Sequence, residues 1–518
     1  MANGKCPISN DLPCRIGFLV LWMNEGNRLI KRKLKNISCK AGIVGCLLAV
    51  LTAPSFFNSS PKDIYDVVIL NGRVIDPESG LDAVRNVAVS DGVIKTITDG
   101  SLSGRTVIDA RGLIVSPGFI DLHQHGQTEE NYRFKIMDGV TTALELEVGT
   151  GDVDRWYAER QGKAMINYGV SVGHLAARMA AMHDPVQFLP SGEAARRAAT
   201  DAEINDMKAQ LEHGLQRGAV AVGFGIQYVP QASHWEILEM FRVAARFGAS
   251  CHVHLRNAGL KEPASSTQAL EEVIAAAAIT GAPLHVVHIH STGGKATPKL
   301  LQMIAEARSR NLDVTTECYP YTAGMTDIKS AIFNEGWREV FGIDYGDLQW
   351  AATGERLTKE SFERYRKQGG FVAVFSMTED VVETALKNPL TMIASDGILE
   401  NGKGHPRTAG TYTRVLGRYV RERGTLTLTD ALRKMTLMPA QRLERRVPSM
   451  KNKGRIRVGA DADLVVFDPA RVTDRATYDE PAKYSEGIKY ALVNGVVVVK
   501  DGQLKPGLYP GRPVRAPY

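Results

Sequence analysis

Short apolar runs recur along the middle of the chain, and each ends in polar side chains. Runs of this length, bounded by turn residues, are typical of buried parallel strands. Amphipathic helical patterns separate most of them; one opens with a Thr-x-x-Glu capping box at residues 200–203 and extends to about Arg217. Strand and helix repeated in this way predict a (β/α)8 barrel of the α/β class. The predicted strands are residues 115–126, 140–149, 169–174, 218–228, 249–256, 283–291, 313–321 and 390–397.

A different pattern lies on both sides of this series. Two strand-like runs with an Asp-Gly hairpin signal precede the barrel, and two similar runs follow it. All-β segments that flank a barrel most simply join into one small domain. We therefore expect a TIM barrel over residues 118–445 and a β-sandwich domain built from residues 62–117 and 446–515. The four runs are residues 64–76, 86–97, 463–468 and 490–499.

Composition and charge narrow the class of protein. Of the 518 residues, 44% are hydrophobic and 23% are charged, which is ordinary for a globular protein with a large core. The formal net charge is +6, and residues 1–53 carry the whole surplus. The remaining chain is electrically balanced, so we expect no nucleic-acid partner.

The basic surplus belongs to a leader, residues 1–53. Six basic residues between Arg28 and Lys40 precede an apolar stretch, residues 41–53, that ends in small residues. This order predicts a secretory signal peptide, and therefore an exported protein that is periplasmic or secreted. Translation would start at Met1 or at Met23. The stretch is short for a membrane span. An uncleaved anchor that holds the protein at a membrane is the alternative.

The first barrel strand ends in His123-Gln-His125. Histidines two residues apart on a strand share one face, where one cation can bind both. Alone the pair is a weak sign of a metal site. Metal-competent side chains also end several later strands, however, and the carboxyl ends of the strands carry the chemistry of α/β barrels.

Several motifs, taken in order, resemble those of the amidohydrolase superfamily, and within it the N-acyl-D-amino-acid deacylase (D-aminoacylase) group. The resemblance covers about residues 64–515. It implies a zinc-dependent barrel with an appended β-sandwich, which hydrolyses an amide. The motifs are His123-Gln-His125 after Pro-Gly-Phe-Ile-Asp, His254-Leu-Arg256, Tyr319-Pro-Tyr321, Ser395-Asp396-Gly397, and His405-Pro-Arg407 followed by Gly410-Thr411.

The residues offer two sets of zinc ligands. Glu147, His254 and His288 come from three strands, and three ligands leave a zinc position open for water. His123, His125 and Asp396 could complete a second, weaker site that shares Glu147. We expect one tight zinc, with a second ion as the open alternative.

The bridging ligand departs from the pattern that the resemblance implies. Many amidohydrolases bridge two metals with a carbamylated lysine on the fourth strand, but residues 219–228 contain no lysine. The deacylase group has a cysteine at the end of the second strand, where this chain reads Glu145-Leu-Glu147. A carboxylate has two oxygens and can bridge, so we favour Glu147 over Glu145.

Asp396 is the candidate general base, because a carboxylate beside a metal can take a proton from water and pass it to the departing amine. A turn aspartate is the alternative. Tyr228 matches the group's tyrosine, which would donate a hydrogen bond to the oxyanion; a packing role is the alternative.

Four residues are candidates for binding the substrate. Tyr319 could bind a carboxylate, or could be a core ring. His290 stands where the group has a lysine, which weakens that carboxylate anchor. Arg256 and Arg407 could compensate as cations, or each could pair with a buried acid.

These residues predict a zinc hydrolase that cleaves a linear amide in a small molecule, above all an N-acyl (D-)amino acid. Opening of a cyclic amide or imide, as in hydantoinase and dihydroorotase, is the alternative reaction. A non-catalytic metal-binding barrel is the alternative from another class.

Overall fold

The computed structural model describes residues 64–185 and 188–517. The leader, residues 1–53, and the signal peptide predicted in it lie outside the described residues. Across the described ranges, no helix has both the length and the apolar character to span a membrane.

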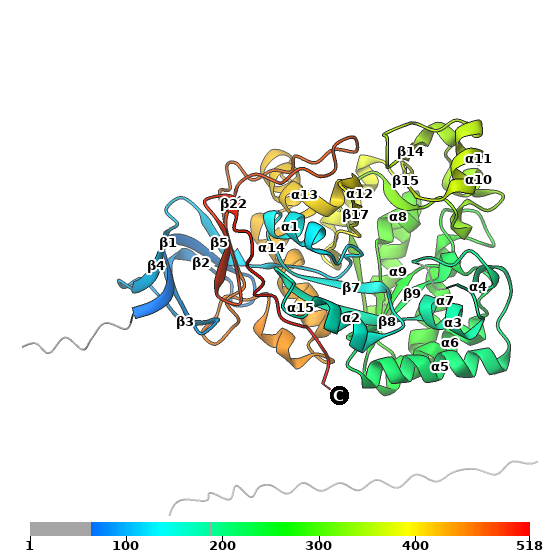
Figure 1. Cartoon of the computed structure of the whole chain (residues 1–518), viewed down its shortest axis with the longest axis horizontal. Coiled ribbons are helices and arrows are strands. Elements are labelled where there is room, and N and C mark those ends of the chain that lie inside the picture. Colours follow the sequence, from blue (N-terminus) through cyan, green and yellow to red (C-terminus); the bar gives the residue numbers. More distant parts are fainter. Residues whose placement is uncertain (1–63, 186–187, 518) are drawn as a thin grey trace, which may run out of the picture. The chain divides into compact units, whose positions relative to one another are not determined.

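Eight parallel strands form the barrel in chain order, and Figure 1 shows the helices that lie around them. The first and last strands meet where the amide of Asp396 donates to the carbonyl of His123 at 2.7 Å, beside a parallel bridge between Gln124 and Gly397. The predicted (β/α)8 barrel is confirmed. Its strands are β6 (Phe119–Asp121), β7 (Val140–Thr150), β8 (Asn167–Gly173), β9 (Ala221–Gly225), β10 (Ser250–His254), β11 (Leu284–Val286), β12 (Val314–Cys318) and β16 (Thr391–Ile393).

Helices alternate with these strands. The predicted capping box is present at the start of α5 (Asp201–Gln216), where the Thr200 side chain accepts from the amide of Glu203 and the Glu203 side chain accepts from the amide of Thr200. The other main helices are α1 (Glu129–Met137), α2 (Val153–Arg160), α3 (His174–Ala181), α6 (His234–Arg246), α7 (Ser266–Thr280), α8 (Ile289–Gly293), α9 (Thr297–Ser309), α12 (Glu379–Lys387), α13 (Arg407–Arg414), the π-helix η5 (Val415–Glu422), α14 (Leu428–Met435) and α15 (Leu437–Leu443).

An insertion separates β12 from β16. It contains a three-stranded sheet and two helices, and its aromatic side chains form a core of their own around Trp337 and Phe362. Its strands have only three or four residues, which is too short to show a period in the sequence. The elements are β13 (Gly324–Asp327), α10 (Trp337–Phe341), β14 (Leu348–Trp350), α11 (Lys359–Gln368) and β15 (Phe371–Val374).

A mixed nine-stranded sheet contains strands from both ends of the described chain. The antiparallel pairing of β5 with β19 joins the amino-terminal strands to the carboxyl-terminal ones. This is the small β domain that was expected beside the barrel. Its strands are β1 (Ile64–Asp76), β2 (Leu81–Ser90), β3 (Val93–Thr98), β4 (Ser103–Asp109), β5 (Ile114–Pro117), β19 (Leu464–Phe467), β20 (Ile488–Val493), β21 (Val496–Lys500) and β22 (Gln503–Leu504).

The run predicted as one barrel strand, residues 115–126, is divided between the two sheets. Its first part is β5 of the nine-stranded sheet, and β6 begins after Gly118. A side chain at Gly118 would collide with Thr141, since an added Cβ would lie 2.1 Å from its Oγ1. The prediction of one strand over residues 115–126 was wrong, because β5 and β6 belong to different sheets. The two histidines, His123 and His125, still follow the end of β6.

Candidate active site

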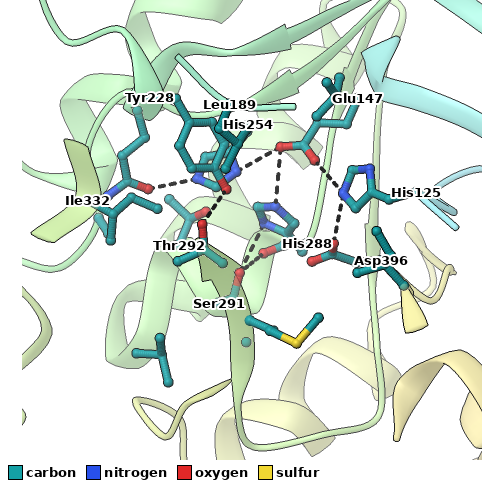
Figure 2. A pocket seen from close by; sticks show the side chains of 18 of the residues that line it. His125, Glu147, Leu189, Tyr228, His254, His288, Ser291, Thr292, Ile332 and Asp396 are labelled. Carbon is teal, nitrogen blue, oxygen red and sulfur yellow. Dashed lines mark hydrogen bonds and ion pairs between the residues drawn. The ribbon is translucent and has the colours of Figure 1, made fainter. Parts of the chain in front are cut away.

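A cavity opens at the carboxyl ends of the barrel strands, and metal-competent side chains from five of them meet on its floor; Figure 2 shows most of these side chains. The candidate metal ligands His125, Glu147, His254, His288 and Asp396 line it, and His123 lies beneath them. Barrel strands place these groups together although the residues are far apart in sequence.

Glu147 stands at the centre of this group (Figure 2). Its strand, β7, runs close to β9 because Gly223 has no side chain: an added Cβ there would lie 2.2 Å from the carbonyl oxygen of Glu147. The two carboxylate oxygens of Glu147 face two different sets of histidines. Glu147 therefore lies between the two candidate ligand sets and belongs to both.

Four donor atoms converge on the Oε2 side of Glu147. The Nε2 atoms of His123 and His125 lie 2.8 Å and 3.2 Å from Oε2, and 3.2 Å from each other. Oδ1 of Asp396 lies 3.4 Å and 3.2 Å from the same nitrogens. Tetrahedral zinc bonds of about 2.0–2.1 Å would hold donors roughly 3.3–3.4 Å apart. The four atoms are thus spaced nearly as ligands of one zinc.

Three donor atoms converge on the Oε1 side. Nδ1 of His254 lies 2.8 Å from Oε1, and Nε2 of His288 lies 4.0 Å from it. This set has only three protein donors, as in zinc sites that keep a position open for water. The structure brings together both ligand sets that the sequence proposed.

The outer nitrogens of the histidines are held by other side chains. Nδ1 of His123 bonds to Glu317 at 2.7 Å, and Nδ1 of His125 bonds to Glu145 at 2.6 Å. Nε2 of His254 bonds to Gln227 at 2.7 Å. In each ring the other nitrogen is left to face the centre, which is the arrangement that orients histidine ligands of metals. The donor set therefore fits zinc.

The charges of the site also suit a cation. Burial lowers the pKa of His123, but the carboxylates of Asp396 and Glu147 raise it to about 10. Burial raises the pKa of Glu147, but His123 and its neighbours hold it well below its usual range. Protons on His123 and His125 thus help to balance the buried carboxylates. A divalent cation would replace these protons on binding.

Two residues of the site have left-handed backbone. His288 has φ 30° and Asp396 has φ 52°, in a region that ordinary side chains seldom adopt. The conformation carries His288 past the end of β11 rather than along it. Such strain tends to persist where a functional site requires it.

Asp396 is shared between the donor set and a cation. Oδ2 lies 2.9 Å from Nη1 of Arg407, while Oδ1 faces His123 and His125. Burial raises the pKa of Asp396, but Arg407 and the histidines hold it below its usual range. Asp396 is therefore an ionised carboxylate fixed by contacts on both of its oxygens. The surroundings of Asp396 do not support the alternative of a simple turn residue.

Both candidate tyrosines line the cavity. The ring of Tyr228 lies 5.0 Å from that of His254, and its hydroxyl accepts from Thr326 at 3.4 Å. Burial and the charge of Glu147 raise the pKa of Tyr228 well above its usual value, so its hydroxyl keeps a proton to donate. The guanidinium of Arg407 lies 4.6 Å from the centre of the Tyr319 ring.

Two residues that were predicted to bind the substrate, Arg256 and His290, do not line the cavity. Arg256 is held by Glu272 at 2.6 Å and 2.8 Å and by the carbonyl of Ala232, so the alternative of pairing with a buried acid holds for it. His290 is fully buried, and its ring lies edge-on to Tyr319 at 4.3 Å. Burial lowers the pKa of His290 to about 3, so it is neutral and cannot replace a lysine as a cationic anchor.

Sequence reasoning missed Glu317 and gave His285 no role. Glu317 is the next-to-last residue of β12, and its second oxygen bonds to Nε2 of His285 at 2.9 Å. Burial raises the pKa of Glu317, but the hydrogen bonds of His123 and His285 lower it to about 2. The sequence held part of the information needed to find Glu317, because it is a carboxylate close to the end of a predicted strand, as the predicted ligands are.

Comparisons with known proteins identify relatives that span most of the chain. A family model described as "Amidohydrolase family" matches residues 106–181 and 169–499. An N-acyl-D-glutamate deacylase of Alcaligenes xylosoxydans xylosoxydans is 32% identical over 87% of this chain and 96% of the relative. A D-aminoacylase of the same organism is 31% identical over 88% of this chain and 98% of the relative.

Solved structures give the same result. A crystal structure of N-acyl-D-glutamate deacylase from Bordetella bronchiseptica, complexed with zinc and a phosphonate inhibitor, matches with a TM-score of 0.76 and 30% identity, over 88% of this chain and all of that one. A D-hydantoinase structure, at 19% identity and a TM-score of 0.58, shares the fold. The chain belongs to the amidohydrolase family.

Proposed function

We propose that this protein is a zinc-dependent hydrolase that removes the acyl group from N-acyl-D-amino acids. The observation that carries the proposal is the position of Glu147, whose two oxygens join a four-donor set to a three-donor set on the floor of a cavity. Three relatives that are 31–32% identical over 87–89% of the chain, two deacylases and a D-aminoacylase, support a linear amide as the substrate. A dihydroorotase that covers 78% of the chain is less similar, at 25% identity.

Each side chain has a part in this reaction. Zinc, when bound, would activate water and polarise the amide carbonyl. Asp396 is placed to accept a proton at Oδ1 and to pass it to the departing nitrogen. Tyr228 keeps its hydroxyl proton and can donate it to the oxygen on which negative charge develops.

The number of metal ions is part of the proposal. We expect a tight zinc on Glu147, His254 and His288 and a second, weaker ion on His123, His125, Glu147 and Asp396. Titration of metal-free protein with zinc, followed by mass spectrometry under native conditions, would count the ions. Tight binding of a single ion that is lost equally in variants of both sets would contradict the two-site proposal.

The activity test measures release of free amine from N-acetyl-D-leucine and N-acetyl-L-leucine, and formation of the N-carbamoyl carboxylate from hydantoin and dihydrouracil, by zinc-loaded protein. We expect hydrolysis of the D-amino acid derivative, and loss of it in Glu147→Gln. Preferential opening of either ring would favour the cyclic-amide alternative, and inactivity on all four compounds and on a wider panel of N-acyl amino acids would overturn the proposal.

A further inference from the structure

An apolar wall forms one side of the cavity, and it includes an exposed aromatic side chain. Phe188 is 37% exposed, although its ring lies 5.2 Å from that of His125 and 6.4 Å from that of Phe371. Leu189 and Ile398 continue the wall. Exposed apolar surface beside the polar groups of a cavity is typical of a ligand-binding surface.

A second hollow meets the cavity at this wall. Phe188, Leu189 and Phe371 line both hollows. On its other sides the second hollow has Trp350 of β14 and Pro190 among its walls, together with the exposed charged side chains of Lys329, Glu400 and Lys403. The two hollows are therefore neighbours, and a molecule that reached from the candidate metal site to the second hollow would pass Phe188 and Phe371.

The cations of the cavity suffice for one carboxylate at most. Among the described residues that line it, Arg407 is the one lysine or arginine, and it is 1% exposed and already paired with Asp396. A second carboxylate on the substrate would be buried without a counter-charge, which is costly. The cavity therefore disfavours an acidic amino-acid side chain and favours apolar groups.

We infer that the substrate carries a long apolar acyl chain, which lies against Phe188 and Phe371 and ends in the second hollow, and has no carboxylate on its amino-acid side chain. This inference rests on the proposed deacylase function and adds the class of substrate. Amino-acid side chains end after a few bonds, whereas an acyl chain has no such limit. The part that reaches the second hollow is therefore the acyl chain.

The first test compares N-acetyl-, N-butanoyl- and N-octanoyl-D-leucine on the zinc-loaded full chain. Complete burial of one methylene is worth about fourfold, so partial burial of the longer chain should raise kcat/KM for the octanoyl compound at least about tenfold over the acetyl compound. Phe188→Ala should reduce this ratio. The control Tyr509→Ala, which removes an aromatic ring of the same 37% exposure outside both hollows, should preserve it.

A binding measurement separates this inference from the proposed function. Isothermal titration calorimetry with octanoate and acetate, which require no turnover, should show tighter binding of octanoate in the unaltered protein and a smaller difference in Phe188→Ala. Equal binding, a flat or falling rate along the acyl series, or a preference for N-octanoyl-D-glutamate over N-octanoyl-D-leucine would overturn the inference. If no N-acyl-D-amino acid is hydrolysed, the proposed function fails and the calorimetry alone decides the inference.

Discussion

Asp396 and Arg407 form an ion pair of 2.9 Å in which both partners are buried. Oδ2 of Asp396 pairs with the guanidinium of Arg407, and Oδ1 lies 3.2 Å from Nε2 of His125. Arg407 was a candidate for binding a substrate carboxylate or for pairing with an acid. The ion pair favours the second role, and it connects Arg407 to the candidate general base.

Arg407→Gln should shift the pH dependence of the reaction. The guanidinium lowers the pKa of Asp396, so its removal should raise that pKa and make the base lose its charge at a higher pH. The acidic limb of kcat/KM should therefore move toward neutral pH. An unchanged limb together with a raised KM for substrates that carry a carboxylate would show that Arg407 acts on the substrate instead.

Asp396→Asn tests proton transfer itself. The amide is nearly isosteric, and Glu147, His254 and His288 remain to hold the tight zinc. We expect thermal stability and tight zinc content near those of the unaltered protein, with turnover lower by roughly 10²-fold or more, the usual contribution of acid–base catalysis. Rate, zinc content and melting temperature should be measured on one preparation. An active variant would end this role for Asp396.

The two glutamates of β7 offer a matched pair. Glu147→Gln should impair metal binding in both sets, because each of its oxygens faces one set. Glu145→Gln should have a smaller effect, since the Glu145 side chain bonds to Nδ1 of His125 and to the backbone amides of Val148 and Gly149 and belongs to neither ligand set of the described residues. Zinc content after dialysis measures the difference. The reverse order would make Glu145 the metal ligand.

Periodicity predicted the barrel and placed Glu147, His254 and His288 at strand ends, because strand alternation and helical repeats are local patterns. The division of residues 115–126 between two sheets was missed, since it depends on how Gly118 packs against Thr141. Strand pairing that is remote in sequence leaves no local pattern.

Side-chain direction beyond the strand ends could not be predicted. His290 follows His288, whose left-handed backbone starts a helix and turns the next side chains into the core. Arg256 likewise depends on Glu272, which comes from a different element, α7. In both cases the tertiary contact decides whether the residue reaches the cavity.

Export stays a prediction from the sequence. A basic segment followed by residues 41–53 predicts cleavage shortly after residue 53 and a mature protein outside the cytoplasm. Amino-terminal sequencing of protein from fractionated cells checks this. A soluble cytoplasmic protein that retains residues 24–50 would contradict it.

Glu317 is expected to position His123 without touching the metal. It is 194 residues from His123 in sequence, yet it accepts from Nδ1 of that ring and from His285. Glu317→Gln should weaken the site of His123, His125 and Asp396 by about 10–100-fold in metal affinity, the usual effect of losing such a partner. Binding to the site of His254 and His288 should change little, because their hydrogen bonds are to Glu147, Gln227 and Ser291 rather than to Glu317.

The matched control for Glu317→Gln is Glu236→Gln. This variant also removes a buried carboxylate that is bonded to a histidine, His174, but it lies away from the cavity. The control should lower the melting temperature and leave both metal affinities intact. Equal loss of metal in the two variants would reduce the role of Glu317 to stability alone.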